Sequence, residues 1–197
     1  MSPAVVSSLV LGTRNPHKVR EIERLLAPAG ISVEPLPARI ELPPEDGETF
    51  ADNALPKARA AATATGRPAI ADDSGIEAAA LNGGPGVRSA RYAGEGATDE
   101  QNLDKLLLEV PPGDSLRYVC ALAYVDPVND LERIFFGTCT GRLAEAARGG
   151  RGFGYDPAFV PDDLGDGRTM AELGESEKDE ISHRGRAVRE LMAWLRG

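Results

Sequence analysis

The sequence predicts an α/β fold in one domain that spans residues 1–197. The length of 197 residues fits a single domain, with room for two lobes. A hydrophobic fraction of 42% beside 27% charged residues is typical of a folded globular protein. Strand-like apolar runs alternate with helix-like segments along the chain, which is the pattern of an α/β protein.

The chain opens with a strand, a tight turn and a helix. Residues 4–13 form an apolar run typical of a buried strand. The helix after it begins with Asn15 as N-cap and Pro16 at its first position, and it stops near Pro28. Its apolar residues share one face, as expected for a helix that covers a sheet.

A second helix and a second strand follow. The helix starts near Thr49, where Asp52 completes a capping box, and it continues past Pro56 to Gly66. Residues 67–75 then read as a short strand that ends at an acidic pair.

The second half of the chain holds a helix, a hairpin and a terminal helix. Thr98 caps a helix predicted to end near Val110, and Gln101 completes its capping box. Residues 115–126 and 131–143 are predicted to pair as a hairpin, because a turn sequence separates these two apolar runs. The segment 176–197 ends in an amphipathic helix.

Composition narrows the expected partners. The net charge of −9 offers no basic surface to a nucleic-acid backbone, so we expect no nucleic-acid partner. No signal peptide is recognisable, and no run approaches the roughly 18 apolar residues of a membrane span, so we expect no membrane partner. Cys120 and Cys139 lack metal-ligand spacing, which favours reduced core residues in a cytoplasmic protein.

The segment Thr13–Lys18 joins the first strand to the first helix. Free N–H groups and the positive end of the dipole at a helix start suit a phosphate, and Thr13, Asn15 and Lys18 add donors. The glycines of a Walker A loop are missing. A well-capped helix with an exposed lysine is the simpler interpretation of this segment alone.

Asp72 and Asp73 follow an apolar run and precede Ser74. Adjacent carboxylates suit Mg²⁺, which takes one or two protein carboxylates plus phosphates and waters. Successive strand residues point to opposite faces, so we expect one aspartate to bind the metal and the other to orient or deprotonate a water. The acidic loop 44–50 is a candidate source of a further carboxylate, and an ordinary surface turn is the alternative for both segments.

Two further segments offer groups for a nucleobase. Phe153 and Tyr155 present aromatic faces for stacking. Lys178 is a phosphate candidate, and His183 and Arg184 are donors beside a glycine. Core aromatics and surface cations would explain each segment equally well if it stood alone.

Taken together and in this order, five motifs closely resemble those of the Ham1/RdgB-type non-canonical purine nucleotide pyrophosphatases, also called inosine or xanthosine triphosphate pyrophosphatases. The motifs are TRNPHK, ADDSG, GGPGVRSARYAG, GFGYDPAF and ISHRG. The resemblance runs from about Leu9 to the C-terminal helix, and the set of five is highly specific.

The resemblance implies a long mixed central sheet with flanking helices and two lobes around a nucleotide-binding cleft. It implies homodimers that hydrolyse ITP, dITP and XTP to the monophosphate and pyrophosphate with Mg²⁺, which removes these nucleotides from the nucleotide pool.

By matching motif, the resemblance also assigns residues. Asp73 would accept a proton and bind Mg²⁺, with Asp72 beside it as the second catalytic residue. The other metal carboxylate is expected at Glu45, with Asp46 as the alternative. The residues expected to bind substrate are Thr13, Arg14, Asn15, Pro16, His17, Lys18, Lys57, Ser74, Phe153, Gly154, Tyr155, Asp156, Lys178, His183 and Arg184.

Besides the choice between Glu45 and Asp46, the first motif departs from the family pattern at one position. Arg14 stands where the first motif usually has glycine, and arginine lacks the backbone freedom of glycine. The turn must therefore accept a side chain, or the phosphate is held differently.

The residues suggest a mechanism and a basis for selectivity. Lys18, Lys57 and Lys178 would neutralise charge on the leaving pyrophosphate. Donors from His183 and Arg184 would accept the 6-carbonyl of hypoxanthine or xanthine and leave the amino group of adenine unpaired.

Three other classes compete with this interpretation. A Maf-type pyrophosphatase would act on other bases, and a nucleotide-sensing module would bind without hydrolysis. The acidic pair argues against a pure binder. An interaction domain would leave the lysines, the acidic pair and the glycine-rich loops as coincidence.

Overall fold

The computed structural model describes residues 6–197, which divide into two compact units. The first comprises the described residues up to Asp73 together with 120–137 and 184–197. The second comprises residues 74–119 and 138–183. The chain passes between the units several times, so each unit is assembled from segments far apart in sequence.

The strands form a six-stranded sheet in the order β2-β1-β3-β4-β5-β6. β1 pairs in parallel with β2 and β3, whereas β5 and β6 are antiparallel, so the sheet is mixed. The strands are β1 Ser8–Leu11, β2 Ser32–Pro35, β3 Ala69–Ala78, β4 Ser115–Asp126, β5 Leu131–Leu143 and β6 Phe159–Pro161. The mixed α/β architecture predicted from the sequence is confirmed.

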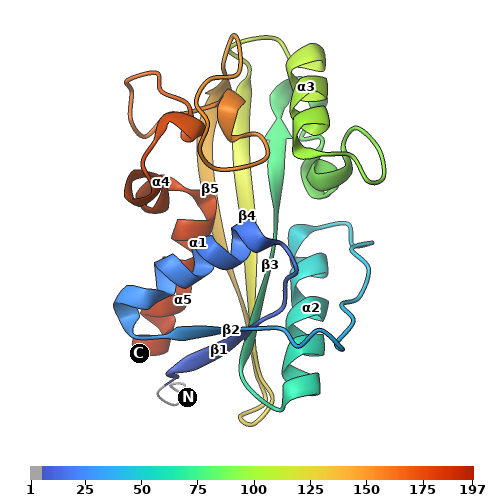
Figure 1. The fold of residues 1–197 in the computed structure, drawn as a ribbon, viewed down its shortest axis with the longest axis vertical. Helices are drawn as coiled ribbons and strands as arrows, with labels where there is room; N and C mark the ends of the chain where they lie inside the picture. Colours follow the sequence, from blue (N-terminus) through green and yellow to red (C-terminus); the bar gives the residue numbers. More distant parts are fainter. Residues whose placement is uncertain (1–5) are drawn as a thin grey trace. The chain divides into compact units, whose positions relative to one another are not determined.

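The α-helices flank these strands (Figure 1). They are α1 Pro16–Leu26, α2 Phe50–Thr65, α3 Asp99–Glu109, α4 Glu175–Ile181 and α5 His183–Arg196. Asn15 caps α1, and Thr49 and Thr98 form capping boxes with Asp52 and Gln101, as predicted. None of the helices in residues 6–197 has the length and apolar character needed to cross a membrane.

The first unit has a core on each face of its strands. Leu9 and Leu11 of β1 pack with apolar residues of α1, β3, β4 and α5. Figure 1 shows α2 on the other side of these strands from α1 and α5. Ala54, Ala58 and Ala61 of α2 are fully buried, so this helix approaches the sheet through small side chains. Asn53 and Lys57 are buried beside these alanines on α2.

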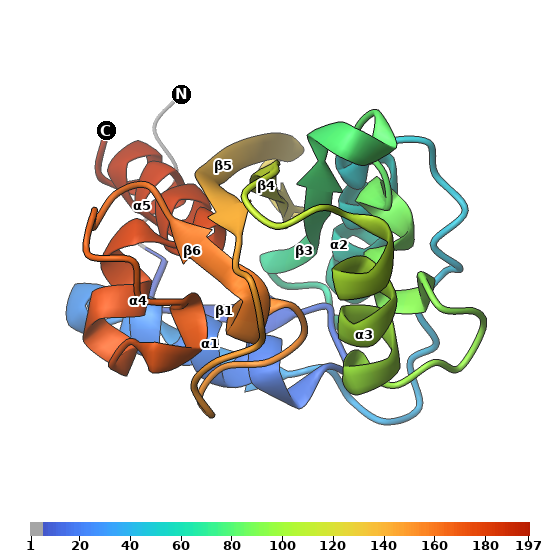
Figure 2. The ribbon, with the colours of Figure 1, turned by 90° about the horizontal axis from the view of Figure 1, so that it is seen from above.

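The second unit has a separate core. Apolar residues of β3, β4, β5 and β6 pack with those of α3, and Tyr118, Tyr155 and Phe159 supply its aromatic part. Figure 2 shows α3 and α4 on opposite sides of the strand ends of this unit. Cys139 is buried here and Cys120 in the first unit, both as free thiols, as predicted.

Two strand predictions need correction. The strand expected over 4–13 is β1, Ser8–Leu11; residues 4 and 5 lie outside the described residues. The short strand expected to end at the acidic pair is wrong, because β3 continues through both aspartates to Ala78. The charge of the pair suggested an exposed strand end, but both carboxylates are buried in the middle of the strand.

The alanine face of α2 generates a stability prediction. Ala58→Leu places a larger side chain at a fully buried position, and overpacking of this kind costs about 1–3 kcal/mol. Urea unfolding followed by the fluorescence of Trp194, the only tryptophan in the sequence, measures the change. Ala64→Leu is the matched control on the exposed side of the same helix, expected within about 0.5 kcal/mol of wild type. Equal effects would contradict the packing described for α2.

Candidate functional site

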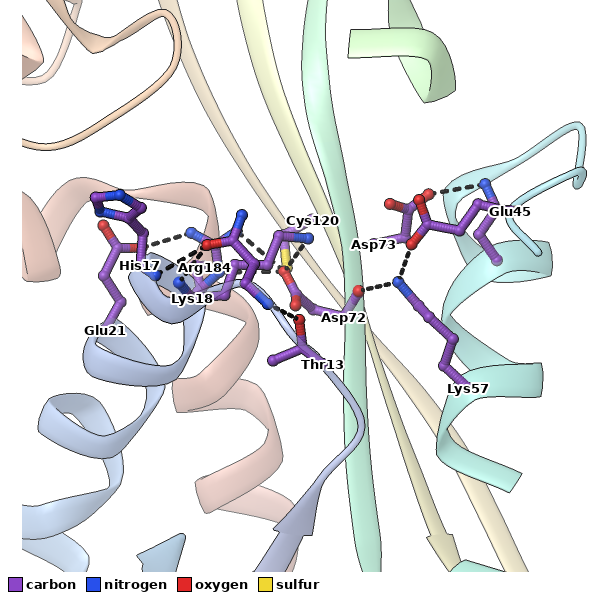
Figure 3. A network of polar contacts seen from close by, with 12 residues as sticks. Thr13, His17, Lys18, Glu21, Glu45, Lys57, Asp72, Asp73, Cys120 and Arg184 are labelled. Atoms are coloured by element: carbon purple, nitrogen blue, oxygen red, sulfur yellow. Dashed lines mark hydrogen bonds and ion pairs between the residues drawn. The ribbon is translucent and has the colours of Figure 1, made fainter. Parts of the chain in front are cut away.

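Asp72 and Asp73 lie side by side on β3 and face opposite ways. Figure 3 shows Asp72 directed toward Lys18 and Arg184, and Asp73 directed toward Glu45. This follows from the alternation of side chains along a strand. Asp72 is 0% exposed and Asp73 is 5% exposed, so neither carboxylate is a surface turn residue. The two aspartates therefore belong to different environments within the first unit.

Asp72 meets two cations from distant segments. Its Oδ2 lies 3.2 Å from Lys18 Nζ and accepts hydrogen bonds from Arg184 Nη2 at 3.0 Å and Nε at 3.1 Å. Arg184 also donates to Glu21, which is buried as well. The buried guanidinium of Arg184 thus joins a carboxylate of β3 to one of α1 (Figure 3).

These cations set the ionisation of Asp72. Burial alone would raise its pKa, but Lys18, Arg184 and Lys57 outweigh burial and hold the pKa well below the ordinary range. Burial and the neighbouring Asp72 raise the pKa of the Cys120 thiol to about 12, so this thiol remains protonated at neutral pH. Asp72 is therefore a permanently charged, firmly held group.

Asp72 Oδ1 is different from its partner oxygen. It is buried and accepts no hydrogen bond within residues 6–197. Buried carboxylate oxygens almost always have a donor, so the second oxygen of Asp72 is able to accept a hydrogen bond from a group other than these residues.

Asp73 lies in a second group with Glu45, Lys57 and Asn53. Lys57 donates to the Glu45 carboxylate and, at 2.7 Å, to the main-chain carbonyl of Asp72. Asn53 Nδ2 donates to Asp73 Oδ2 at 2.9 Å. Asn53 and Lys57 are four residues apart on α2, and this spacing places them on one face of the helix.

The pKa values of the two carboxylates in this second group are shifted in opposite directions. Burial raises the pKa of Asp73, and the negative charge of Glu45 adds to this rise against the opposing effect of Lys18 and Lys57. Burial also acts to raise the pKa of Glu45, but Lys57 and Lys18 lower it overall. Asp73 is thus the carboxylate of this group that takes up a proton most readily.

The start of α1 combines capping with positive charge. Asn15 Oδ1 accepts from the backbone N–H of His17 at 2.9 Å and of Lys18 at 3.2 Å. Thr13 Oγ1 accepts from the N–H of Asn15 at 3.2 Å. His17 Nδ1 lies 2.9 Å from Arg20 Nη2. Lys18 is thereby held one turn into α1 beside Asp72, whereas the side chain of Arg14 is directed to a different segment, residues 36–40.

The second unit gathers the base-binding candidates around Asp156. Its Oδ2 accepts from Lys178 Nζ at 2.6 Å and from the N–H of Phe153 at 3.0 Å, and its Oδ1 accepts from the hydroxyl of Tyr118 at 3.1 Å. Lys178 Nζ lies 5.2 Å from the centre of the Phe153 ring. Tyr118 stacks on His183, with 4.6 Å between ring centres. Asp156 thus fixes both the glycine-rich loop and the lysine.

The remaining residues predicted to bind substrate differ in their burial and in their hydrogen-bond partners. The hydroxyl of Tyr155 donates to the carbonyl of Ser89 at 2.7 Å, and the ring belongs to the core. The N–H of Gly154 donates to Asp99 at 3.0 Å. Ser74 is half-buried on β3 directly after the acidic pair. Phe153, which is half-buried, is therefore the more accessible aromatic ring of the two predicted for stacking.

Sequence reasoning missed Glu21, Asn53 and Tyr118. Helical spacing was a usable signal for two of them: Glu21 lies three residues after Lys18, and Asn53 lies four residues before Lys57. Tyr118 carried no such signal, since its contacts with Asp156 and His183 arise only from the fold.

The carboxylate oxygens of the first unit are of the kind that bind a divalent cation. Four carboxylates, those of Glu21, Glu45, Asp72 and Asp73, meet three cations, those of Lys18, Lys57 and Arg184. Among residues 6–197 no group of three His, Cys, Asp or Glu side chains could hold a metal alone. Glu45 and Asp73 could therefore supply only two oxygen ligands, a number that suits Mg²⁺, which commonly takes one or two protein carboxylates together with phosphates and waters.

Comparison with known proteins gave consistent matches over nearly the whole chain. Residues 9–194 match the profile described as the Ham1 family. The dITP/XTP pyrophosphatase of Erwinia tasmaniensis is 47% identical, covering 97% of this chain and 95% of that protein. The dITP/XTP pyrophosphatase of Symbiobacterium thermophilum is 50% identical over 91% of this chain and 90% of its own length. A solved HAM1 protein from Coxiella burnetii is 41% identical with a TM-score of 0.82, covering 95% of this chain and 98% of that one.

The buried ion cluster generates a second stability prediction. Arg184→Met leaves Asp72 and Glu21 without their shared cation, and breaking a buried pair costs about 3–5 kcal/mol. Arg59→Met removes an exposed pair with Glu132 and is expected to cost less than about 1 kcal/mol. Urea unfolding of both variants measures the difference. An Arg184 variant as stable as the control would show that Arg184 does not neutralise Asp72.

Proposed function

Because the chain belongs to the Ham1 family, we propose that it is a nucleoside-triphosphate pyrophosphatase that hydrolyses ITP, dITP and XTP. The products are the nucleoside monophosphate and pyrophosphate, and the enzyme thereby removes non-canonical purine nucleotides from the pool. The observation that carries the proposal is the placement of Asp73 and Glu45 together beside Lys57, in a chain similar to dITP/XTP pyrophosphatases over nearly its full length.

Glu45 and Asp73 hold Mg²⁺ in this proposal. When bound, the ion neutralises phosphate charge and helps to acidify a water molecule. Glu45 rather than Asp46 is the second ligand, because Glu45 lies against Lys57 and influences the pKa of Asp73, whereas Asp46 is exposed. Lys57 keeps Glu45 ionised and in place before the ion arrives.

Asp73 serves as the proton acceptor. A water oxygen attacks the α-phosphorus, the bond between this phosphorus and the bridging oxygen to the β-phosphorus breaks, and the proton of the water passes to Asp73 Oδ. Pyrophosphate leaves with the bridging oxygen. Asp72 is a poor base by comparison, since Lys18 and Arg184 depress its pKa, and its role is to hold these cations.

Cations and main-chain donors bind the triphosphate. Lys18 and Lys57 neutralise charge that develops on the leaving pyrophosphate. The segment Thr13–Lys18 adds the positive end of α1, where Thr13, Asn15, Pro16 and His17 shape the turn. Ser74 follows the catalytic aspartate and contributes a hydroxyl.

The group around Asp156 recognises the base. Phe153 provides the stacking surface, and His183 provides a donor to the 6-carbonyl of hypoxanthine or xanthine. Lys178 was expected at the leaving pyrophosphate, but we assign it to the base as a second donor, because its ammonium binds Asp156 and lies over the Phe153 ring. Adenine carries an amino donor at this position, so its binding would leave buried donors unpaired. Arg184 acts indirectly in this scheme, since its donors face Asp72 and Glu21.

We further propose a homodimer that acts in the cytoplasm. Both cysteines are buried free thiols, which suits a reducing compartment.

Val128 and Phe136 are large apolar side chains exposed on the β4–β5 hairpin and are candidates for burial against a second copy. Light scattering coupled to gel filtration measures the mass and tests the dimer.

Substrate selectivity is the first test of the proposed function. Pyrophosphate release is measured with ITP, dITP, XTP, GTP and ATP in the presence of Mg²⁺. We expect the first three to be cleaved at least about tenfold faster than ATP, and activity to vanish with EDTA and return with added Mg²⁺. Preference for pyrimidine or modified nucleotides would indicate a Maf-type activity. Binding of ITP without release of pyrophosphate would indicate a sensing module.

The choice of metal ligand is tested by a matched pair of variants. Glu45→Gln keeps the size of the side chain but removes its charge, so we expect the rate at limiting Mg²⁺ to fall at least about tenfold. Asp46→Asn removes the neighbouring charge from an exposed side chain and leaves the rate near that of wild type. The reverse result would assign the metal to Asp46.

A further inference from the structure

Arg14 is bound to a segment of loop that lies far from it in the sequence. Its guanidinium donates to four main-chain carbonyls, those of Leu36 at 2.7 Å, Pro37 at 2.9 Å, Ala38 at 3.3 Å and Ile40 at 2.7 Å. The N–H of Ile40 also donates to the carbonyl of Pro37 at 3.0 Å, which closes a turn. One side chain therefore gathers a whole turn of the backbone.

The same loop is fixed at a second point, Gly47. Its N–H donates to Asn53 Oδ1 at 2.8 Å, while the Nδ2 of the same asparagine donates to Asp73. A Cβ atom at Gly47 would lie 2.6 Å from Asp52 Cβ and 2.7 Å from Asn53 Oδ1, so only glycine allows this approach. The loop thus meets α2 next to the catalytic aspartate.

Residues 41–46 span these two fixed points without regular secondary structure. Pro43 and Pro44 restrict the backbone of this span and of the residue before each proline. Glu45 lies within the span and contacts Lys57. A short span with both ends held and two prolines inside has few conformations open to it, which limits where the Glu45 carboxylate can go.

We propose that Arg14 is a positioning residue for the metal site: it holds the turn 36–40 so that the following span presents Glu45 beside Asp73. This rests on the proposed function, in which these two carboxylates bind Mg²⁺. A loop that is already ordered loses less conformational entropy when the ion binds, so the clamp increases metal affinity. Without the contacts of Arg14, binding of the ion would itself have to order the loop, and the metal affinity would be lower.

The proposal also explains an arginine in the first motif. Thr13 and Asn15 on either side of it serve the start of α1, but the Arg14 side chain extends to the loop and directs its donors there. Nη1 donates to one carbonyl, and the two N–H groups of Nη2 are shared among the other three, an arrangement that uses the planar fork of a guanidinium and that the ammonium of lysine does not copy. Arg14 therefore links the phosphate-binding turn to the acidic loop.

Trypsin gives a direct readout of the clamp, because Arg39 is exposed within the clamped turn. Wild type, Arg14→Met and the control Arg67→Met are digested without metal, and mass spectrometry follows cleavage after Arg39. Arg67 pairs with Glu34 and Ser8, so its loss removes a surface cation of the same unit without touching residues 36–48. We expect cleavage at least about fivefold faster in Arg14→Met only.

Metal binding is measured on the same proteins without substrate. The loss of the free Mn²⁺ signal in electron paramagnetic resonance reports binding to the carboxylate pair. We expect the dissociation constant for Mn²⁺ to rise about fivefold or more in Arg14→Met and to stay unchanged in Arg67→Met. Arg14→Lys, which keeps the charge but not the planar fork, is expected between wild type and Arg14→Met, and it replaces the methionine variant if that one does not fold.

Two other outcomes would overturn the proposed role of Arg14, and a third would overturn the proposed function alone. Unchanged cleavage and Mn²⁺ binding with a raised KM for ITP would make Arg14 a substrate-binding residue. Faster cleavage with unchanged Mn²⁺ binding would mean that the turn does not govern the metal site. A wild type that binds Mn²⁺ but releases no pyrophosphate would contradict the proposed function while leaving the clamp intact.

Discussion

The buried ionic contact of Asp72 with Lys18 and Arg184 is the interaction on which the first unit depends. It joins α1, β3 and α5, three elements that the sequence places far apart. A carboxylate in the middle of a strand and out of contact with water would be prohibitively costly without compensating cations. The cations in turn need Asp72 and Glu21, since Arg184 is itself fully buried. Each charge is tolerated only because the others are present.

This arrangement separates the two adjacent aspartates. Asp72 is ionised, paired and fixed, and on its side of β3 the two cations Lys18 and Arg184 balance the two carboxylates of Asp72 and Glu21. Asp73 faces the other side, where burial and the negative charge of Glu45 raise its pKa. A buried carboxylate with a raised pKa is typical of a functional site, and the negative charge of Asp73 makes the folded protein less stable. Asp72 is thus the structural member of the pair, and Asp73 is the reactive member in the proposed mechanism.

Local signals in the sequence predicted much of the fold. The Asn15 cap, the capping boxes at Thr49 and Thr98, and the hairpin of β4 and β5 depend on neighbours within a few residues, and all are present. The course of β3 was mispredicted because its length depends on pairing with other strands. The two adjacent aspartates suggested that the strand ends there, but the fold brings Lys18 and Arg184 from distant segments to Asp72 and the strand continues.

The candidate site was predictable in its residue types but not in its pairings. Lys57, Asp73 and Glu45 were expected near one another, and the structure places them together. Arg184 was expected to face the base, yet its donors bind Asp72 and Glu21. Arg14 was expected at the phosphate, yet its side chain binds the turn 36–40. Long side chains reach several possible partners, and only the tertiary structure selects among them.

The division of roles between the aspartates is tested most directly by the free energy of unfolding of Asp72→Asn and Asp73→Asn at neutral pH. Asp72 has a depressed pKa in the folded protein, so its charge stabilises the fold, and its loss should lower stability markedly. Asp73 has a raised pKa, so its charge opposes folding, and asparagine should leave stability unchanged or increase it. Equal destabilisation by both substitutions would make both aspartates structural and contradict this account.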